Sequence, residues 1–447
     1  MTDQLPQVWT TTQISELCNV LKEKGSESVT PYLEISNVSI VSKDYTLTEK
    51  PSVKGCRLAK RHDVLVSKVR PTRGAITYVR EEDLHVSSAF TVLRNKGAMA
   101  EKYLWMFLAW NHKYLNHLGE NCTGTMYPTT SDEVVVDFEV PLAPLNEQRR
   151  IVAKLDKLLA KVEACQERLN KIPALLKRFR QSVLAAACSG RITADWRDQN
   201  KYAVDVNYTQ EALSDFPLLP DTWFWQPLAT VCEKVVDCPH STPKWTNSGR
   251  LCVRTTNFKP GLLDLTEVRY VSDETFMERI LRVKPQPGDV LYSREGGILG
   301  IACMIPKEVE LCLGQRMMLL RTHPSFSGML LMHWLNSRTI QYRVQELIGG
   351  SASPHLNVKD IKNFPTPVPP IAEQHEIVRR IGALFKIADQ IEERYQKAKA
   401  HIDKLIQSIL AKAFRGELVP QDQNDEPASA LIERIRKVPL ERRSLKA

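Results

Sequence analysis

The sequence lacks the long apolar run that a membrane protein needs. A membrane-spanning helix takes roughly 20 apolar residues, and the best candidate extends only from Tyr103 to Trp110. The N-terminus has neither the basic nor the apolar region of a secretion signal. We therefore expect a cytoplasmic protein that does not enter a membrane.

Catalytic motifs are missing as well. The chain contains no Gly-Lys-Ser/Thr phosphate loop, no GxSxG, no HExxH and no GxGxxG after a strand. Its only Pro-Pro pair follows Val368, so the Asn/Asp-Pro-Pro-Tyr/Phe motif of adenine methyltransferases is absent. The only Pro-Asp, at 220–221, has no nuclease Glu-x-Lys after it. We interpret the chain as non-enzymatic by itself, with a stand-alone nuclease or methyltransferase as the weaker alternative.

The cysteines show no metal-binding pattern. There are ten, and none forms a Cys-x-x-Cys pair. Without a secretion signal they are expected to be free thiols. Cys232, Cys238 and His240 lie close in sequence, but their spacing matches no zinc site. We predict no metal and no cofactor in this chain.

The positive charge is modest and unevenly distributed. The 447 residues include 61 Lys and Arg against 52 Asp and Glu, a net charge of +9. This balance permits a polyanionic partner without requiring one. Within residues 54–80, however, eight basic side chains oppose only Asp63. Such a cluster suits contact with phosphate, although a solvated basic surface is the alternative.

An internal repeat organises the chain. The segment PLAPLNEQRRIV at 141–152 recurs as PVPPIAEQHEIV at 367–378, and the same offset of 226 residues relates RQSVLAAACSGRI at 180–192 to IQSILAKAFRGEL at 406–418. The stretches before the repeats pair only loosely, as LPQVW at 5–9 does with LPDTW at 219–223. We therefore predict two divergent modules, each followed by a copy of one similar segment.

Each repeated segment has the pattern of a long helix. Apolar residues alternate at spacings of four and three over more than four heptads, which indicates a helix with one apolar seam. Such a helix would be about 60 Å long. Pro173 interrupts the first copy, where we expect a bend or break, while the second copy has Lys399. The predicted seam comprises Ile151, Leu155, Leu158, Val162, Leu169, Leu176 and Phe179 in the first copy, and Ile377, Ile381, Leu384, Ile391, Tyr395, Ile402 and Leu405 in the second.

The two seams need a partner. A homodimeric coiled coil is one possibility. The other, which we favour, is that the two copies pack on each other within one chain, because the intervening module can return the chain antiparallel. A rigid spacer would then separate two unlike modules.

Short β-branched runs followed by a helical stretch predict α+β structure for both modules. Hydroxyl, amide and basic side chains on turns between strands can contact phosphates and base edges. The DNA-binding candidates of the first module are Lys54, Arg57, Arg61, Lys68, Arg70, Arg73, Thr125 and Tyr127. Those of the second module are Thr242, Lys244, Arg254, Asn257, Ser293, Arg294, Gly297 and Ser351.

These features together resemble a known family. Each module is followed by Pro-x-x-Pro-x-x-Glu-Gln and a helix ending Gln-Ser-Val/Ile-Leu-Ala-x-Ala-x-x-Gly. This arrangement resembles the specificity (S) subunit of type I restriction–modification systems. IPALLKRFRQSVLAAACSGRIT at 172–193 is most similar to the type IA subfamily. TPKW at 242–245 and GDVLYSREGG at 288–297 resemble second-module phrases of the family, although Ser241 stands where many relatives have glycine.

The resemblance implies a fold and a function. It implies two target recognition domains of mixed α/β structure, and two helices that pack as an intramolecular antiparallel coiled coil with pseudo-twofold symmetry. The expected bounds are 1–146 for the first domain, 147–197 for the central helix, 198–372 for the second domain with its linker, 373–419 for the distal helix and 420–447 for a tail that docks locally.

The implied function is the recognition of a bipartite, asymmetric site in double-stranded DNA. Two methyltransferase (M) subunits would methylate adenine N6 with S-adenosylmethionine. Two restriction (R) subunits would cleave DNA with ATP and Mg. The rival hypothesis is a non-enzymatic coiled-coil scaffold with two protein-binding lobes.

Overall fold

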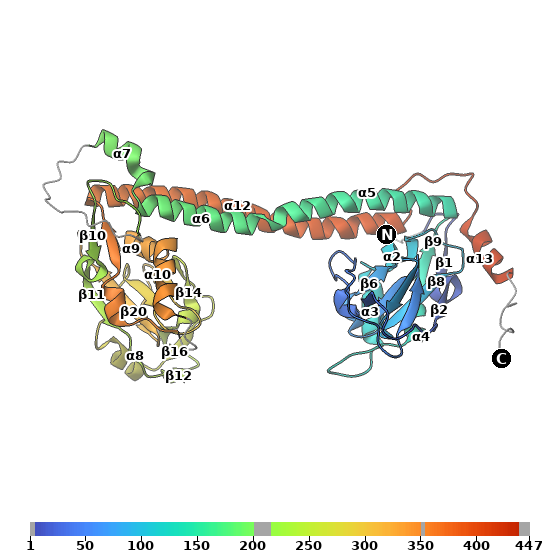
Figure 1. Cartoon of the computed structure of the whole chain (residues 1–447), viewed down its shortest axis with the longest axis horizontal. Coiled ribbons are helices and arrows are strands. Elements are labelled where there is room, and N and C mark those ends of the chain that lie inside the picture. Colours follow the sequence, from blue (N-terminus) through green and yellow to red (C-terminus); the bar gives the residue numbers. More distant parts are fainter. Residues whose placement is uncertain (1–4, 201–215, 350–353, 438–447) are drawn as a thin grey trace. The chain divides into compact units, whose positions relative to one another are not determined.

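The computed structural model describes residues 5–200, 216–349 and 354–437 (Figure 1). The chain forms two compact units. Unit 1 comprises Met1–Asn170 and Gln396–Ala447, and unit 2 comprises Lys171–Tyr395. Each unit therefore contains one module and part of each repeated helix.

The module of unit 1 is built on an antiparallel sheet in the order β2-β8-β5-β6. A three-stranded sheet, β3-β7-β4, lies in the same module, and β1 pairs with β9. The strands are β1 (Thr10–Gln13), β2 (Cys18–Leu21), β3 (Tyr32–Leu33), β4 (Arg57–Lys60), β5 (Val64–Ser67), β6 (Ile76–Tyr78), β7 (Asp83–Val86), β8 (Phe90–Asn95) and β9 (Glu139–Leu142). The helices are α1 (Ile14–Leu17), α2 (Tyr103–Leu108), α3 (His112–Glu120) and α4 (Asp132–Val136).

Strand β5 is buried on both faces, which explains its unbroken apolar run. Side chains alternate between the two faces of a strand. Val64 and Val66 accordingly join the core formed with α2 and α3, while Leu65 joins the core formed with the three-stranded sheet. The sheet thus separates two apolar layers.

The module of unit 2 has the same plan. Its main sheet has the order β11-β20-β17-β18, its second sheet the order β12-β16-β13-β19, and β10 pairs with β21. The strands are β10 (Phe224–Pro227), β11 (Cys232–Asp237), β12 (Trp245–Thr246), β13 (Arg250–Val253), β14 (Phe258–Lys259), β15 (Leu262–Leu263), β16 (Arg269–Val271), β17 (Val290–Ser293), β18 (Ala302–Met304), β19 (Cys312–Leu313), β20 (Met317–Thr322) and β21 (Pro365–Val368). The helices are α8 (Asp273–Ile280), α9 (Gly328–Leu335), α10 (Arg338–Ile348) and α11 (Val358–Lys362).

The duplication extends into the modules, where the sequence pairs only loosely. Asp63 precedes β5 and Asp289 precedes β17, at the same offset of 226. Each carboxylate accepts two hydrogen bonds from one arginine: Arg94 at 2.9 and 2.7 Å, and Arg321 at 2.8 and 2.7 Å. The two modules therefore share a framework and differ in what is attached to it.

The helices differ as Pro173 predicts. The first copy forms α5 (Leu145–Asn170) and α6 (Ile172–Cys188), with the break directly before the proline. The second copy is one helix, α12 (Ile371–Phe414). The missing N–H and the ring of proline disrupt the helical ladder, and Lys399 does neither.

Each unit contains an antiparallel helix pair within one chain, as expected. In unit 1, Ile151 of α5 shares a core with Leu410 and Ala413 of α12. In unit 2, Val183 of α6 shares a core with Ile377 and Ile381.

The buried stripe follows the predicted seam only in part. The predicted seam residues Phe179, Ile391 and Leu405 are 37%, 41% and 48% exposed, so they lie outside the buried stripe. An α-helix has 3.6 residues per turn, so a strict 3.5-residue repeat drifts around a straight helix. In α12 the inward-facing side chains Ile402, Ile406 and Leu410 are spaced by four residues twice in succession, where the heptad pattern alternates between four and three. The buried stripe therefore does not include Leu405. Buried seam residues are Ile151, Leu155, Val162, Leu176, Ile377, Ile381 and Tyr395, and half-buried ones are Leu158, Leu169, Leu384 and Ile402.

The helices end in short docked segments. Helix α7 (Ala194–Gln199) follows α6, and α13 (Ala428–Lys437) lies beyond α12. Ala428, Leu431 and Ile432 of α13 join the core of unit 1, so the described part of the tail docks locally, as predicted. Within the described part of the chain, no helix is long and apolar enough to cross a bilayer.

Candidate nucleic-acid interface

Two basic candidates of the first module are bound to an internal acid. Arg57 and Lys68 both lie 3.2 Å from Asp132, and their side chains are only 14% and 17% exposed. Burial alone would raise the pKa of Asp132, but the hydrogen bond from Thr91 and these two cations together hold that pKa below its usual value. Both cations are therefore bound to the same carboxylate inside the module, and we assign them a structural role.

Two other candidates face solvent. Lys54 is exposed on the turn before β4. Arg61 is 54% exposed and pairs at 3.2 Å with Glu82, which is itself 82% exposed. An exposed ion pair of this kind contributes little to stability, so Glu82 holds Arg61 only weakly.

Arg70 and Arg73 lie on a tight turn that follows β5. Arg70 has a left-handed backbone, with φ of +48°, and donates its N–H to the Pro128 carbonyl at 2.7 Å. Arg73 is exposed at the end of the turn. The buried Lys43 supports the turn from the interior of the module by donating to the Gly74 carbonyl at 2.8 Å. Desolvation lowers the pKa of this amine to about 8. Lys43 was not predicted as the support of this turn, because no sequence pattern sets it apart from other lysines.

The segment 123–129 forms a closed loop beside this turn. Thr123 and Thr129 exchange backbone hydrogen bonds of 2.8 and 2.9 Å. Thr125 is exposed, and Tyr127 is 66% exposed beneath the Arg70 guanidinium, which lies 4.9 Å from the ring centroid. Arg70, Arg73, Thr125 and Tyr127 thus gather at adjoining turns, although they are far apart in sequence.

In the second module, Thr242 and Lys244 are exposed on a turn with a buried support. Arg279 of α8 is 6% exposed and donates to the Leu313 and Gly314 carbonyls at 3.0 Å and to the Ser241 carbonyl. Its guanidinium thereby fixes the turn to the segment after β19. No sequence pattern distinguishes Arg279 from other basic residues of a surface helix.

Asn257 belongs to the frame of the module, and Arg254 contributes its backbone N–H to it. Asn257 is buried, accepts from the Arg254 N–H at 2.9 Å, and donates to the carbonyls of Asp264 and Glu267. All its polar atoms are therefore used within the protein. Arg254 is half-buried and follows β13.

Ser293 and Arg294 are also internal. Ser293 is fully buried and exchanges hydrogen bonds with the backbone of Ile301. Arg294 is 6% exposed and binds both carboxylate oxygens of Asp237, at 2.8 and 2.9 Å. Such a bidentate pair leaves few donors for a ligand. We therefore propose no DNA contact for Arg294, nor for the buried Ser293.

Gly297 is exposed, and Ser351 lies outside the described residues. Beside Gly297, Gly296 adopts a φ of +86°, and a Cβ there would lie 3.2 Å from the Arg316 guanidinium. Arg316 is exposed and accepts the Arg294 N–H at its carbonyl at 3.0 Å. Arg316 is an additional cation at this turn. It was not predicted, because the turn is built from two segments that are distant in sequence.

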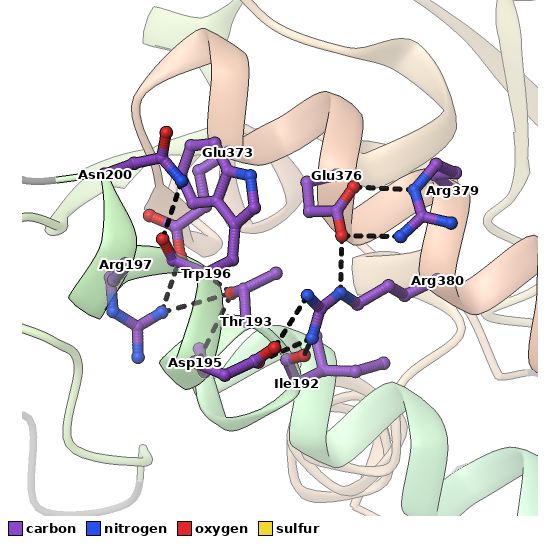
Figure 2. A network of polar contacts seen from close by, with 11 residues as sticks. Ile192, Thr193, Asp195, Trp196, Arg197, Asn200, Glu373, Glu376, Arg379 and Arg380 are labelled. Carbon is purple, nitrogen blue, oxygen red and sulfur yellow. Dashed lines mark hydrogen bonds and ion pairs between the residues drawn. The ribbon is translucent and has the colours of Figure 1, made fainter.

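Each module is anchored to a helix of its own unit through a buried glutamate. Glu373 of α12 accepts from Trp223 at 2.8 Å and Thr193 at 2.7 Å, and it pairs with Arg197 at 2.5 Å. Figure 2 shows Arg197 and Thr193 converging on this carboxylate, with the Asp195–Arg380–Glu376 contacts beside it.

Comparison with known proteins identifies the family. Residues 6–174 and 265–400 match the family model described as the type I restriction modification DNA specificity domain. The chain belongs to this family. It is 35% identical over 342 residues to the type I restriction enzyme EcoBI specificity subunit of Escherichia coli, covering 72% of this chain and 69% of that protein. The EcoKI specificity subunit of Escherichia coli K12 is 25% identical over 467 residues, covering 97% and 96%.

Solved structures agree on the fold. The HsdS subunit of Thermoanaerobacter tengcongensis superposes with a TM-score of 0.56 at 23% identity, covering 93% of this chain and 98% of that one. A chain from a structure concerned with complex assembly of the type I R-M system gives a TM-score of 0.68 at 23% identity, covering 93% and 100%. The matching family model and the named relatives show that this chain is the DNA-recognition subunit of a restriction–modification system, as predicted, and they do not favour the scaffold alternative. Assignment to subfamily IA stays a prediction.

Proposed function

We propose that this specificity subunit recognises a bipartite, asymmetric DNA sequence, one half with each module. One observation carries the proposal: the modules share a sheet order and an Asp–Arg framework, yet carry different polar groups on their turns. The first presents Arg70, Arg73 and Tyr127, and the second presents Thr242, Lys244, Gly297 and Arg316. Arginine and lysine contact phosphates and guanine edges, and hydroxyl groups contact either.

Residues 1–146 and 198–372 would act as the two target recognition domains, and 147–197 with 373–419 as the spacer that sets the gap between half-sites. The catalytic steps would take place on partner subunits. Two M subunits would transfer methyl groups from S-adenosylmethionine to adenine N6, with the flipped base in their pocket. Two R subunits would cleave DNA with ATP and Mg. This assembly would work in the cytoplasm, and this chain would contribute recognition alone.

A module exchange tests the proposal. Residues 206–366 would be replaced by the corresponding segment of a relative with a different target, and methylated adenines would be mapped across a genome. We expect one half-site to change while the other stays the same. A simultaneous change of both halves would contradict modular recognition, and loss of all methylation with a folded, assembled complex would contradict the boundaries.

A second experiment tests the spacer. Four residues, about one helical turn, would be inserted into α5 and into the facing part of α12 in unit 1. The gap between the two methylated half-sites should lengthen while both half-sites remain unchanged. An unaltered gap in an active complex would show that the helices do not set it.

A further inference from the structure

The loop 123–129 carries an apolar side chain at its exposed tip. Met126 is 81% exposed and Tyr127 is 66% exposed. In Figure 1 the loop projects from the module between α3 and α4. A methionine in this position adds nothing to the core, because it packs against little of its own protein. Met126 and Tyr127 are therefore available for contact with whatever this turn region binds.

The loop is well braced for such a contact. The hydrogen bonds between Thr123 and Thr129 close its base, and the Thr130 N–H donates to the Lys68 carbonyl at 2.9 Å. Gly124 has a φ of +85°, and an added Cβ would lie 3.3 Å from the Tyr127 carbonyl oxygen. A loop fixed before binding loses little conformational entropy when it binds.

The surroundings of the tip are cationic. The Arg70 guanidinium covers the Tyr127 ring at 4.9 Å, and Arg73 lies on the same turn as Arg70. A surface with an apolar tip and arginines beside it is complementary to duplex DNA, whose phosphates flank an apolar base stack. Architectural DNA-binding proteins use methionine among other apolar side chains as wedges between base steps.

We propose that Met126 is an apolar wedge that enters a base step of the half-site contacted by the first module. Arg70 holds Tyr127 behind the wedge, and Arg73 binds the adjoining phosphate. The inference rests on the proposed function and adds a specificity mechanism to it, because a step that unstacks easily accepts the wedge at lower cost.

The wedge is expected in one half-site only. By the repeat offset of 226, the counterparts of Met126 and Tyr127 are Ala352 and Ser353, which lie outside the described residues. Alanine and serine are too small to fill the space between two bases. The half-site of the second module should therefore stay stacked where that of the first is opened.

Fluorescence of 2-aminopurine tests the wedge, because its emission rises when the base is unstacked. The chain would be purified with its methyltransferase subunits and bound to target duplexes with the probe at successive positions. We expect enhanced emission at one step of the first module's half-site, apart from the methylated adenine. Met126→Ala should abolish it and weaken binding by about tenfold, while the signal at the flipped adenine persists.

Met277→Ala is the matched control, since Met277 is 59% exposed on α8 of the other unit, and it should leave emission and affinity unchanged. Tight binding with no enhanced step outside the flipped adenine would overturn the wedge and leave the proposed function intact. Failure of the wild-type complex to bind any duplex would overturn both. If replacing a single thymine by uracil reproduces the Met126→Ala loss without a change in emission, Met126 contacts a methyl group and the wedge is wrong.

Discussion

Glu147 in unit 1 and Glu373 in unit 2 occupy the same position of the repeat, and both are fully buried. Each accepts a hydrogen bond from a tryptophan indole, Trp9 at 2.9 Å and Trp223 at 2.8 Å. The other carboxylate oxygen meets different chemistry. Gln421 donates to it in unit 1 at 2.6 Å, whereas Thr193 and Arg197 donate to it in unit 2.

The two anchors differ in the charge of the group that contacts this second carboxylate oxygen. Burial raises the pKa of Glu147 above its ordinary value, against the opposing hydrogen bonds of Trp9 and Gln421 and the charge of Arg150. In unit 2, Arg197 places a cation directly on the carboxylate. In both anchors a buried glutamate accepts a hydrogen bond from a tryptophan indole. Its second contact is a neutral amide in unit 1 and an ion pair in unit 2. The duplication kept the steric frame while the electrostatics diverged.

The largest expected loss of stability comes from changing the anchor glutamate of unit 2, and the same change in unit 1 should cost less. Glu373→Gln leaves the mostly buried Arg197 without its carboxylate, and we expect unit 2 to lose about 3 kcal/mol of stability. Glu147→Gln leaves no unpaired cation on this site, because an amide oxygen still accepts from Trp9 and Gln421 can turn its own oxygen inward. Unit 1 should lose about 1 kcal/mol. Backbone hydrogen exchange in increasing urea measures each unit separately.

A double variant checks the cause. Combining Glu373→Gln with Arg197→Met removes the unpaired cation as well, and it should be less destabilising than the sum of the two single changes. Equal losses from Glu147→Gln and Glu373→Gln would show that the ion pair adds nothing beyond the amide contact.

The sequence predicted the helices better than the modules, for a physical reason. A helix records its packing in a periodic pattern, and proline marks its interruption, so the α5–α6 break at Pro173 could be foreseen. The exact stripe could not, because the phase of α12 near Leu405 depends on what Ile406 and Leu410 meet in the module. Local sequence does not contain that information.

The candidate interface shows the same limit. Arg70, Arg73 and Tyr127 stand out in the sequence as basic and aromatic side chains on turns, and the structure places them on adjoining surface turns, while their contact with DNA stays a prediction. Arg294 stands out equally, yet it is an internal partner of Asp237, a residue 57 positions away. Only the pairing of distant strands distinguishes a cation that faces solvent from one that binds the frame. The shared offset of Asp63 and Asp289 was the available signal that both modules have one framework.

The second expected effect should be the same in both units. Gly190 and Gly416 close the repeated helices with φ of +72° and +77°. An added Cβ would approach the ring of Pro220 to 2.4 Å and that of Pro6 to 2.5 Å. Gly190→Ala and Gly416→Ala should therefore each cost about 2 kcal/mol, in units 2 and 1 respectively. Clearly unequal losses, measured by the same hydrogen-exchange protocol, would show that the steric frame has diverged too. Gly382→Ala in α12, where no atom would meet the new Cβ, is the control.

The smallest effect is an opposite response to acid of Glu147 in unit 1 and of Glu376, one turn after the anchor Glu373, in unit 2. The raised pKa of Glu147 means that the folded chain takes up this proton before the unfolded chain does. Unit 1 therefore gains stability from Glu147 as the pH falls toward 4.5. Glu376 is the reverse case, because hydrogen bonds from Arg379 and Arg380 lower its pKa from 4.5 to about 2, and its contribution is lost as the pH falls from 4.5 toward 2.

Stability curves from pH 7 to pH 2 for wild type, Glu147→Gln and Glu376→Gln isolate the two contributions. Acidification should increase the advantage of wild type over Glu147→Gln in unit 1, and it should remove the advantage of wild type over Glu376→Gln in unit 2. Because the pKa of Glu376 falls from 4.5 to about 2 on folding, the second change should extend gradually over that interval. Parallel pH responses of the two variants would contradict the opposite electrostatic surroundings of Glu147 and Glu376, whatever the outcome for the glycines.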